Sequence, residues 1–197
     1  MPAKGDHEAR RADVAEAVWR VLATRGFGGL TMRAVATELG ASTGLLTHYF
    51  RSKRDLVRYA NEIAAERTDT RPLLEADEPG LAALRMTLVN VLSLNADSVA
   101  MNRVWVSFWD AALDDESLSE AQRARYERWR GRIQACVVEA QARGELPAAA
   151  NPEDVAVQAA AFTHGLVVQA LFDPERLPPD RQLALVDDFL AGLTGRR

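Results

Sequence analysis

The stretch LTMRAVATELGASTGLLTHYFRSKRDLV, Leu30 to Val57, contains two short helical patterns separated by a glycine. In the first pattern Val35 and Leu39 lie four positions apart, so that both face inward from one helix. Gly40 follows directly, and glycine is the residue best suited to the left-handed turn that ends a helix. Ser42 can then cap a second helix. A helix, a glycine-containing turn and another helix form the helix-turn-helix motif, whose second helix enters the major groove of DNA.

The outward face of the second helix carries side chains that suit DNA. Hydroxyl groups and an exposed apolar side chain can contact base edges or a thymine methyl, and a lysine near the next helix suits a phosphate. These residues are Thr43, Gly44, Leu45, Thr47 and His48, flanked by Tyr49, Arg51, Lys53 and Arg54. An ordinary pair of helices with a solvated polar face would have the same spacing, so spacing alone leaves both readings open.

Charge is divided unevenly along the chain. Residues 1–58 hold ten Lys or Arg against six Asp or Glu, a net charge of +4, whereas residues 59–197 hold fourteen against twenty-two, a net charge of −8. Such asymmetry suggests that one end meets a polyanion and the other does not. A chance fluctuation of a few charges would look the same, so only the helix-turn-helix motif can show whether the positive end binds a polyanion.

The composition of the 197 residues excludes several classes of protein. A hydrophobic content of 48% is too high for a disordered or fibrous chain. The single cysteine, Cys136, cannot form a disulfide within the chain, which favours a reducing compartment. The polar segment Met1 to Arg11 is unlike a signal peptide, and no apolar run approaches the roughly 18 residues of a membrane helix. We therefore expect a cytoplasmic protein without a membrane partner.

The pattern of the whole chain predicts an all-α fold. Its eight prolines fall where helices would begin or end, hydrophobic residues recur at helical spacing, and no stretch alternates long enough for a strand. Thr31, Ser52, Ser117 and Asn151 are candidate helix caps. We expect an N-terminal three-helix helix-turn-helix domain, residues 1–52, joined to a helical ligand-binding and dimerisation domain, residues 53–197. The expected helices, about nine in number, lie near 7–25, 31–38, 42–49, 53–75, 79–95, 98–114, 118–143, 152–172 and 179–194.

The last two expected helices are candidates for a dimer interface. Symmetric dimers that read two half-sites are usual for helix-turn-helix proteins, and two helices from each copy can form a four-helix interface. The stripes that suggest this contain Ala156, Val157, Ala160, Phe162, Gly165, Leu166 and Gln169, then Leu183, Val186, Leu190 and Leu193. The alternative is that these stripes face only the core of their own subunit.

Aromatic residues in the larger part are candidates for a small-molecule site. An aromatic-lined cavity suits an apolar or a cationic ligand, because ring faces attract quaternary ammonium groups. The candidates are Trp105, Phe108, Trp109, Tyr126, Trp129, Phe162 and His164, with Phe172 beside them and Asp110, Asp114 or Glu127 as a counter-charge. An aromatic stripe at helical spacing is more often packed core, so both readings stay open.

The stretch from Leu30 to Val57 resembles the DNA-binding region of the TetR family of bacterial repressors. The likeness includes the Gly26–Phe27 pair and the HYF-SK--L segment, and a weaker similarity of RVWVSFWDAAL, Arg103 to Leu113, points to the choline-responsive BetI group. The resemblance implies nine helices, a homodimer, a ligand-sensing domain and a repressor released from a palindromic operator by a small molecule.

The same resemblance assigns roles in DNA binding by position. It implies base contacts from Arg33, Thr43, Gly44, Leu45 and Thr47, and phosphate contacts from Thr31, Ser42, His48, Tyr49 and Lys53. Thr47 departs from the family, because many members carry an aromatic residue there.

Other functions have less support in the sequence. His7, His48 and His164 lack the spacing of a metal pair, and no catalytic triad or phosphate loop is evident, so we expect no enzyme activity, cofactor or metal. An all-α small-molecule carrier is the second hypothesis. A sequence-indifferent architectural DNA protein would need positive charge over a broad surface, which the acidic remainder lacks.

Overall fold

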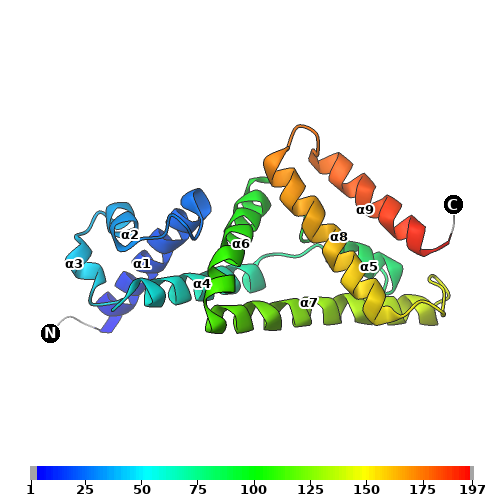
Figure 1. The fold of residues 1–197 in the computed structure, drawn as a ribbon, viewed down its shortest axis with the longest axis horizontal. Coiled ribbons are helices and arrows are strands. Elements are labelled where there is room, and N and C mark those ends of the chain that lie inside the picture. The colour runs from blue at the N-terminus through cyan, green and yellow to red at the C-terminus, as the bar shows by residue number, and fades with distance from the viewer. Residues whose placement is uncertain (1–3, 196–197) are drawn as a thin grey trace. The chain divides into compact units, whose positions relative to one another are not determined.

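A computed structural model describes the chain from residue 4 to residue 195, with side chains from residue 10 onward. Nine helices and no strand form within this part of the chain, which confirms the all-α prediction (Figure 1). The helices are α1 (Lys4–Arg25), α2 (Met32–Leu39), α3 (Thr43–Leu46), α4 (Lys53–Thr70), α5 (Leu81–Val89), α6 (Ala96–Asp114), α7 (Glu116–Ala142), α8 (Pro152–Phe172) and α9 (Pro179–Leu193).

The helices group into two compact units. Unit 1 contains the chain up to Arg71 together with Arg103–Ser119, and unit 2 contains Pro72–Asn102 together with the chain from Glu120 onward. Helices α6 and α7 therefore contribute residues to both units. Unit 1 includes more than the predicted head of residues 1–52, and the functional boundary after residue 52 stays a prediction.

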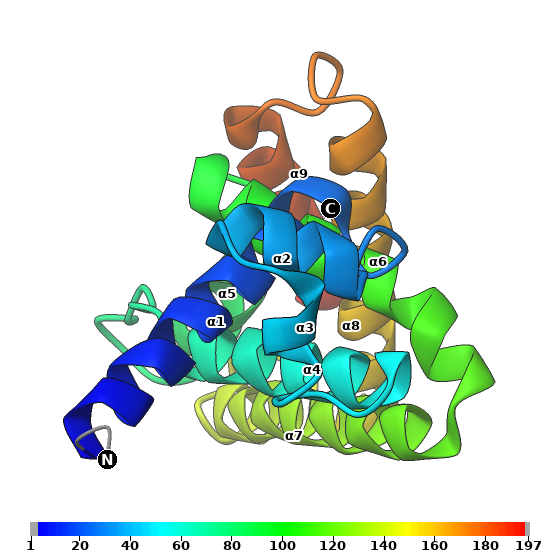
Figure 2. The same cartoon turned by 90° about the vertical axis from the view of Figure 1, so that its left-hand side faces the viewer.

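In unit 1, α1 lies beside α2 and α4, and α3 lies next to α2 (Figures 1 and 2). Its core is aliphatic where these helices meet, with Leu22, Leu46 and Leu56 fully buried. The segment 103–119 adds an aromatic part, since the rings of Phe27 and Phe108 have centroids 4.9 Å apart. Apolar burial of this kind is the main force that holds the short α2 and α3, which would be unstable alone.

In unit 2, the core lies between α5, α7, α8 and α9. Leu88 of α5, Ile133 and Val137 of α7, Ala159 of α8 and Val186 of α9 are all fully buried in one hydrophobic cluster. Each comes from a stripe of residues three or four positions apart.

Helices α4 and α5 end earlier than predicted. α4, expected to reach residue 75, ends at Thr70, because Arg71 precedes Pro72 and takes an extended conformation with φ −65° and ψ 145°. α5, expected over 79–95, covers only Leu81–Val89. Beyond it, the backbone bonds to a buried side chain: the Ser93 N–H donates to Gln182 Oε1 at 3.1 Å.

The start of α7 corrects one predicted cap. The helix begins at Glu116, and Asp115 caps it by accepting hydrogen bonds from the backbone N–H groups of Ser117 and Leu118. Ser117, expected as the cap, is already inside the helix. The predicted caps Ser52 and Asn151 are confirmed, since each side chain accepts a backbone N–H of its helix.

α8 contradicts the expectation that no segment has the length and composition of a membrane span. It holds 21 residues with a mean hydropathy of 1.5 in its most apolar window. Its buried side chains, among them Val155, Ala159 and Val167, pack in the core of unit 2. The core helix of a globular domain meets the same criteria, so this helix is weak evidence for a membrane.

Candidate nucleic-acid interface

The first helix of the motif has the predicted beginning and end. Thr31 Oγ1 accepts a hydrogen bond of 3.0 Å from the Ala34 N–H at the start of α2. Gly40 ends the helix with φ +66°, and the Ala41 N–H donates to the Ala36 carbonyl at 2.9 Å. This pattern satisfies the last carbonyl groups and turns the chain sharply toward α3.

The second helix is shorter than predicted. Only Thr43–Leu46 is α-helical, whereas 42–49 was expected, and the Ser42 side chain makes no capping hydrogen bond. The chain continues in tighter turns, with the His48 N–H donating to the Leu45 carbonyl at 3.2 Å. These bonds between residues three apart are usual at helix ends, and they keep residues 47–49 close to α3.

The ten predicted DNA-binding residues lie on the surface of unit 1. Thr31, Arg33, Ser42, Thr43, Gly44, Thr47, His48 and Lys53 are exposed, and Leu45 and Tyr49 are half-buried. Leu46 and Phe50, between them in sequence, are buried at 0% and 5% exposure. The motif therefore has one buried face and one accessible face.

The cations around the motif fall into two groups that the sequence does not distinguish. Arg20 pairs with Glu38 at 2.7 Å, and Arg54 pairs with Asp115 at 2.6 Å. Arg33 and Lys53 form no ion pair with any residue that the structure describes. The second group is available for phosphates or bases, while the first is engaged within the protein.

Asp115 and Ser117 form contacts with α4 that sequence reasoning missed. The Arg54 guanidinium, and then the Ser117 hydroxyl, hold the pKa of the Asp115 carboxyl well below its usual range. Arg58 Nη2 also donates to Ser117 Oγ at 3.0 Å. The start of α7 is thereby linked to α4, the helix that follows the helix-turn-helix. No local signal marks partners about sixty positions apart.

The predicted ligand-binding aromatics are divided between the two units. In unit 1, Phe108 is fully buried, and Trp105 meets it edge to face with centroids 5.7 Å apart. The Trp105 indole N–H donates to Thr68 Oγ1 at 2.9 Å. Trp109, also in unit 1, is half-buried. Trp105 and Phe108 therefore occupy the core of unit 1, and their role in ligand binding stays a prediction.

In unit 2, three of the candidates come together. The His164 ring lies 4.7 Å from the Trp129 ring and 5.2 Å from the Tyr126 ring, measured between centroids. Phe162 instead stacks on Phe189 of α9 at 4.5 Å. Burial, with a smaller effect of the Arg125 charge, lowers the pKa of His164 to about 4. The histidine is therefore neutral near pH 7.

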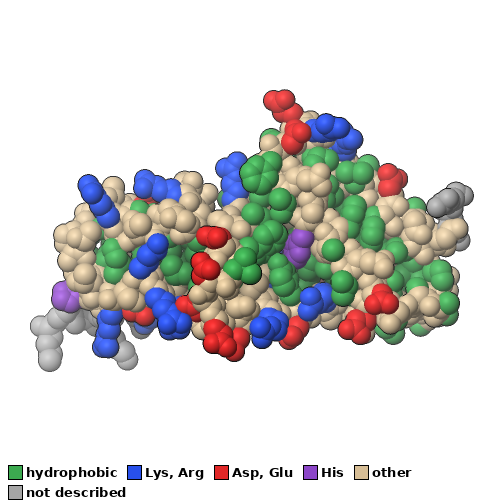
Figure 3. All heavy atoms as spheres, in the orientation of Figure 1, with side chains coloured by type: hydrophobic (Ala, Val, Ile, Leu, Met, Phe, Trp, Pro, Cys, Tyr) green, Lys and Arg blue, Asp and Glu red, His purple; other side chains and the backbone are tan. Residues whose placement is uncertain are grey.

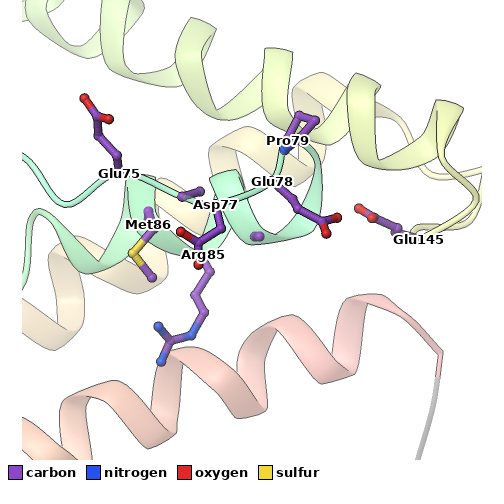
Figure 4. A pocket seen from close by; sticks show the side chains of 9 residues that line it. Glu75, Asp77, Glu78, Pro79, Arg85, Met86 and Glu145 are labelled. Carbon is purple, nitrogen blue, oxygen red and sulfur yellow. The ribbon is translucent and has the colours of Figure 1, made fainter.

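A hollow of about 340 Å³ lies at the start of α5, as Figure 4 shows. Two of its carboxylates already have partners: Glu145 accepts from the Leu81 N–H at 2.7 Å and pairs with Arg143, which also binds Glu78. Gly80 has no side chain to cap α5, and a Cβ at its φ of +79° would overlap the Glu145 carboxylate. The hollow thus contains a helix cap supplied by a distant residue.

The predicted interface residues of α8 and α9 are partly core residues. Ala156, Ala160, Leu166, Val186 and Leu190 are buried within unit 2. Two other predicted residues, Val157 and Gly165, belong to a stripe of α8 that is accessible and apolar, and Figure 3 shows hydrophobic side chains gathered over this helix. The stripe consists of Val157, Ala161, Gly165, Val168 and Phe172, of which Val168 is half-buried and the others are exposed.

A capped helix-turn-helix with an accessible outer face, followed by a second helical unit, defines a DNA-binding regulator. Comparison with known proteins gives its family. Residues 14–60 match the model of bacterial regulatory proteins of the TetR family, and residues 80–195 match the model described as BetI-type transcriptional repressor, C-terminal. The chain belongs to the TetR family of transcriptional regulators and is a DNA-binding repressor, not an enzyme.

Relatives cover the chain almost completely. The transcriptional regulator PksA of Bacillus subtilis is 28% identical over 92% of this chain and 88% of its own length, and BetI of Burkholderia mallei is 28% identical over the full length of both. A transcriptional regulator from Rhodococcus sp. superposes with a TM-score of 0.80 at 22% identity, covering 92% of this chain and 94% of its own. One from Saccharomonospora viridis, solved with choline, gives 0.76 at 22% identity, covering 93% and 96%.

Proposed function

We propose that the chain acts in the cytoplasm as a homodimeric repressor, which a small-molecule effector releases from a palindromic operator. The observation that carries this proposal is the accessible face of the helix-turn-helix, with the cations Arg33 and Lys53, which form no ion pair with a described residue. Arg33, Thr43, Gly44, Leu45 and Thr47 contact bases. Thr31, Ser42, His48, Tyr49 and Lys53 contact phosphates.

Toward a base, Thr47 would act only as a hydrogen-bond acceptor. Its hydroxyl donates to the Gly44 carbonyl at 2.7 Å, which uses its single hydrogen. The oxygen lone pairs remain, so Thr47 accepts a hydrogen bond from an amino group such as N6 of adenine or N4 of cytosine. The departure from the aromatic residue of many family members therefore changes a stacking or apolar contact into a polar one.

Binding to DNA is tested with a palindrome from the promoter region of its own gene. Fluorescence anisotropy at moderate salt should show clear preference for the palindrome over a scrambled duplex of the same composition. Equal affinity for the two duplexes would refute the operator and favour the architectural or the carrier alternative.

The exposed apolar stripe of α8 supports dimerisation. Large apolar patches on a soluble domain usually mark interfaces, and Val157 and Phe172 are 48% and 82% exposed. The two helix-turn-helix motifs of such a dimer must lie roughly 34–36 Å apart to reach successive major grooves. We place the interface on α8 and α9, the helices predicted at 152–172 and 179–194.

Paired valine variants test this interface. Val157→Arg puts a charge on the stripe, at its N-terminal end, and should convert the dimer to a monomer in light scattering. Val138→Arg is the matched control, because Val138 is 51% exposed on α7 outside the stripe. A monomeric wild-type protein, or equal effects of the two substitutions, would contradict the proposed interface.

The effector would bind in the part of the chain after residue 52. Trp105, Phe108, Trp109, Tyr126, Trp129, Phe162 and His164 remain its candidate residues. Helices α6 and α7 connect such a site covalently to the helix-turn-helix unit, since both contribute to both units, and an ion pair of Asp115 with Arg54 links the start of α7 to α4. By linkage, effector and operator weaken each other's binding by the same factor.

A further inference from the structure

The inward stripe of α7 changes character along the helix. From Trp129 onward its buried residues are apolar and include Ile133 and Val137 at 0% exposure. Toward the helix start, the stripe instead contains Gln122, one and two turns before Tyr126 and Trp129. A long polar side chain therefore occupies a position where the rest of the stripe is hydrophobic.

Gln122 is buried without hydrogen bonds. The residue is 7% exposed, and neither Oε1 nor Nε2 has a partner among the described residues. The indole N–H of Trp129, which is also 7% exposed, lacks a partner as well. Buried polar groups are nearly always paired, and each unpaired one destabilises the fold. Two of them on one helix face suggest that their partners belong to another molecule.

The charges near these two groups indicate what that molecule carries. His164 packs on Trp129 and is neutral near pH 7, and the charge that acts on it comes from Arg125. The carboxylates that could supply a counter-charge to a cation, Asp110, Asp114 and Glu127, are all exposed. The amide and indole N–H groups are donors, so the site favours an acceptor over a positive charge.

We propose that Gln122 and Trp129 bind the polar part of the effector, and that this part is a carbonyl group, as in an amide or a carboxylate, not a quaternary ammonium. Gln122 Nε2 donates to the carbonyl oxygen, while Oε1 accepts from an amide N–H where one is present. Trp129 offers a second donor two turns along α7, about 10 Å in helical rise, so that the effector extends along the helix. The proposal rests on the proposed function, because it describes the effector of that regulator.

The stability of two glutamine variants tests whether the Gln122 amide is unpaired. Gln122→Met keeps the length of the side chain and removes both polar atoms, so it should raise the melting temperature of the ligand-free protein by a few degrees. Gln134→Met, at an exposed glutamine of the same helix, should leave it unchanged. A lower melting temperature for Gln122→Met would show that a buried water or another group satisfies the amide, and would overturn the proposal.

Three probes that share a phenyl ring test the chemical class: benzamide, benzoate and phenyltrimethylammonium. At about ten times its Kd, a bound probe stabilises the folded protein by about 1.4 kcal/mol, which raises the melting temperature of a protein of this size by about 3–6 °C. We expect this shift with benzamide or benzoate in the wild type, a smaller shift in Trp129→Phe and none in Gln122→Met. A shift only with phenyltrimethylammonium, an equal shift in Gln122→Met, or no shift with any probe at 10 mM would each overturn the proposal.

Operator binding separates this proposal from the proposed function. Gln122→Met should bind the palindrome as tightly as the wild type, because the substitution lies outside the DNA-binding face. If the wild type does not discriminate between the palindrome and the scrambled duplex, the regulator function fails, whatever the probes show. If it does discriminate and the probe result is negative, only the effector assignment fails.

Discussion

The surface of unit 1 that we propose faces DNA and the inward stripe of α7 both hold polar groups that have no partner among the described residues, but in opposite surroundings. Arg33 and Lys53 are exposed, so water solvates them until a phosphate or a base replaces it. Gln122 and Trp129 are buried, so that nothing described in the structure replaces the water that they lost. The first arrangement leaves the fold unaffected, whereas the second destabilises it until a ligand binds.

Because of this difference, substitutions in the two places should affect binding and stability differently. On the DNA-facing surface, substitutions should change binding and leave stability nearly unchanged. In the interior, substitutions should change both, and a variant that loses the ligand can gain stability. Measuring the free energy of unfolding together with affinity therefore shows to which group a residue belongs.

The largest expected effect is the dependence of stability on the protonation of His164. Its pKa is about 4 in the folded protein and 6.5 in the unfolded chain, so below pH 6.5 the unfolded chain takes up a proton that the folded protein does not. The stability contributed by the neutral histidine is thus present above pH 6.5 and is lost as the pH falls to about 4, by up to about 3 kcal/mol.

Urea unfolding of the wild type and His164→Gln between pH 4 and pH 8 measures this effect. The free energy of unfolding of the wild type should fall relative to that of the variant as the pH drops through this window. Parallel curves for the two proteins would mean that water solvates His164 in the folded protein, as it solvates the exposed cations of unit 1.

The next effect concerns Arg33 on the DNA-facing surface. Arg33→Ala should weaken binding to the operator by about 1–3 kcal/mol, or roughly 5- to 150-fold, and relax the sequence preference at the base that it contacts. Because Arg33 is exposed and unpaired among the described residues, the free energy of unfolding should change by less than about 0.5 kcal/mol. A large loss of stability would place Arg33 with the structural residues instead.

The sequence predicted which residues of the helix-turn-helix are exposed far better than it predicted the interior. All ten surface residues lie between Thr31 and Lys53, where helix period, caps and a single glycine determine which side chains point outward. Gln122 looks like any polar helix residue, since its burial depends on packing that no local pattern encodes. The same reason explains why Asp115 was not predicted as the partner of Arg54. It also explains why α5 was predicted to continue through the segment where the backbone of Ser93 bonds to Gln182.

An intermediate effect is expected for two glycines of the motif. Gly40→Ala should destabilise the protein by about 1–2 kcal/mol, because its φ of +66° is unfavourable for any residue with a Cβ, although no atom lies within 4 Å of the added group. Gly44→Ala, inside α3, should be neutral or stabilising by up to about 1 kcal/mol and yet weaken operator binding, since the methyl faces the DNA. Thermal unfolding and anisotropy together test this pair, and equal destabilisation by both would show that α3 needs its glycine for folding.

The smallest effect, and the sharpest test of the contrast, comes from the adjacent cations Lys53 and Arg54. Lys53→Ala should weaken binding to all DNA sequences a few-fold, reduce the slope of log affinity against log salt by about 1 and leave stability unchanged. Arg54→Ala should change the salt slope less and lower stability slightly at neutral pH, because it removes the partner of Asp115.

The two variants also differ in acid. The folded pKa of Asp115 is depressed, so its contribution to stability is present above the pKa of the unfolded carboxyl and is lost as the pH falls toward the folded value. The stability difference between the wild type and Arg54→Ala should therefore disappear in acid, whereas Lys53→Ala should match the wild type throughout. Equal reductions of the salt slope by the two substitutions would mean that Arg54 leaves Asp115 and binds a phosphate when DNA is present. The distinction between cations paired within the protein and cations available to DNA would then fail in the complex.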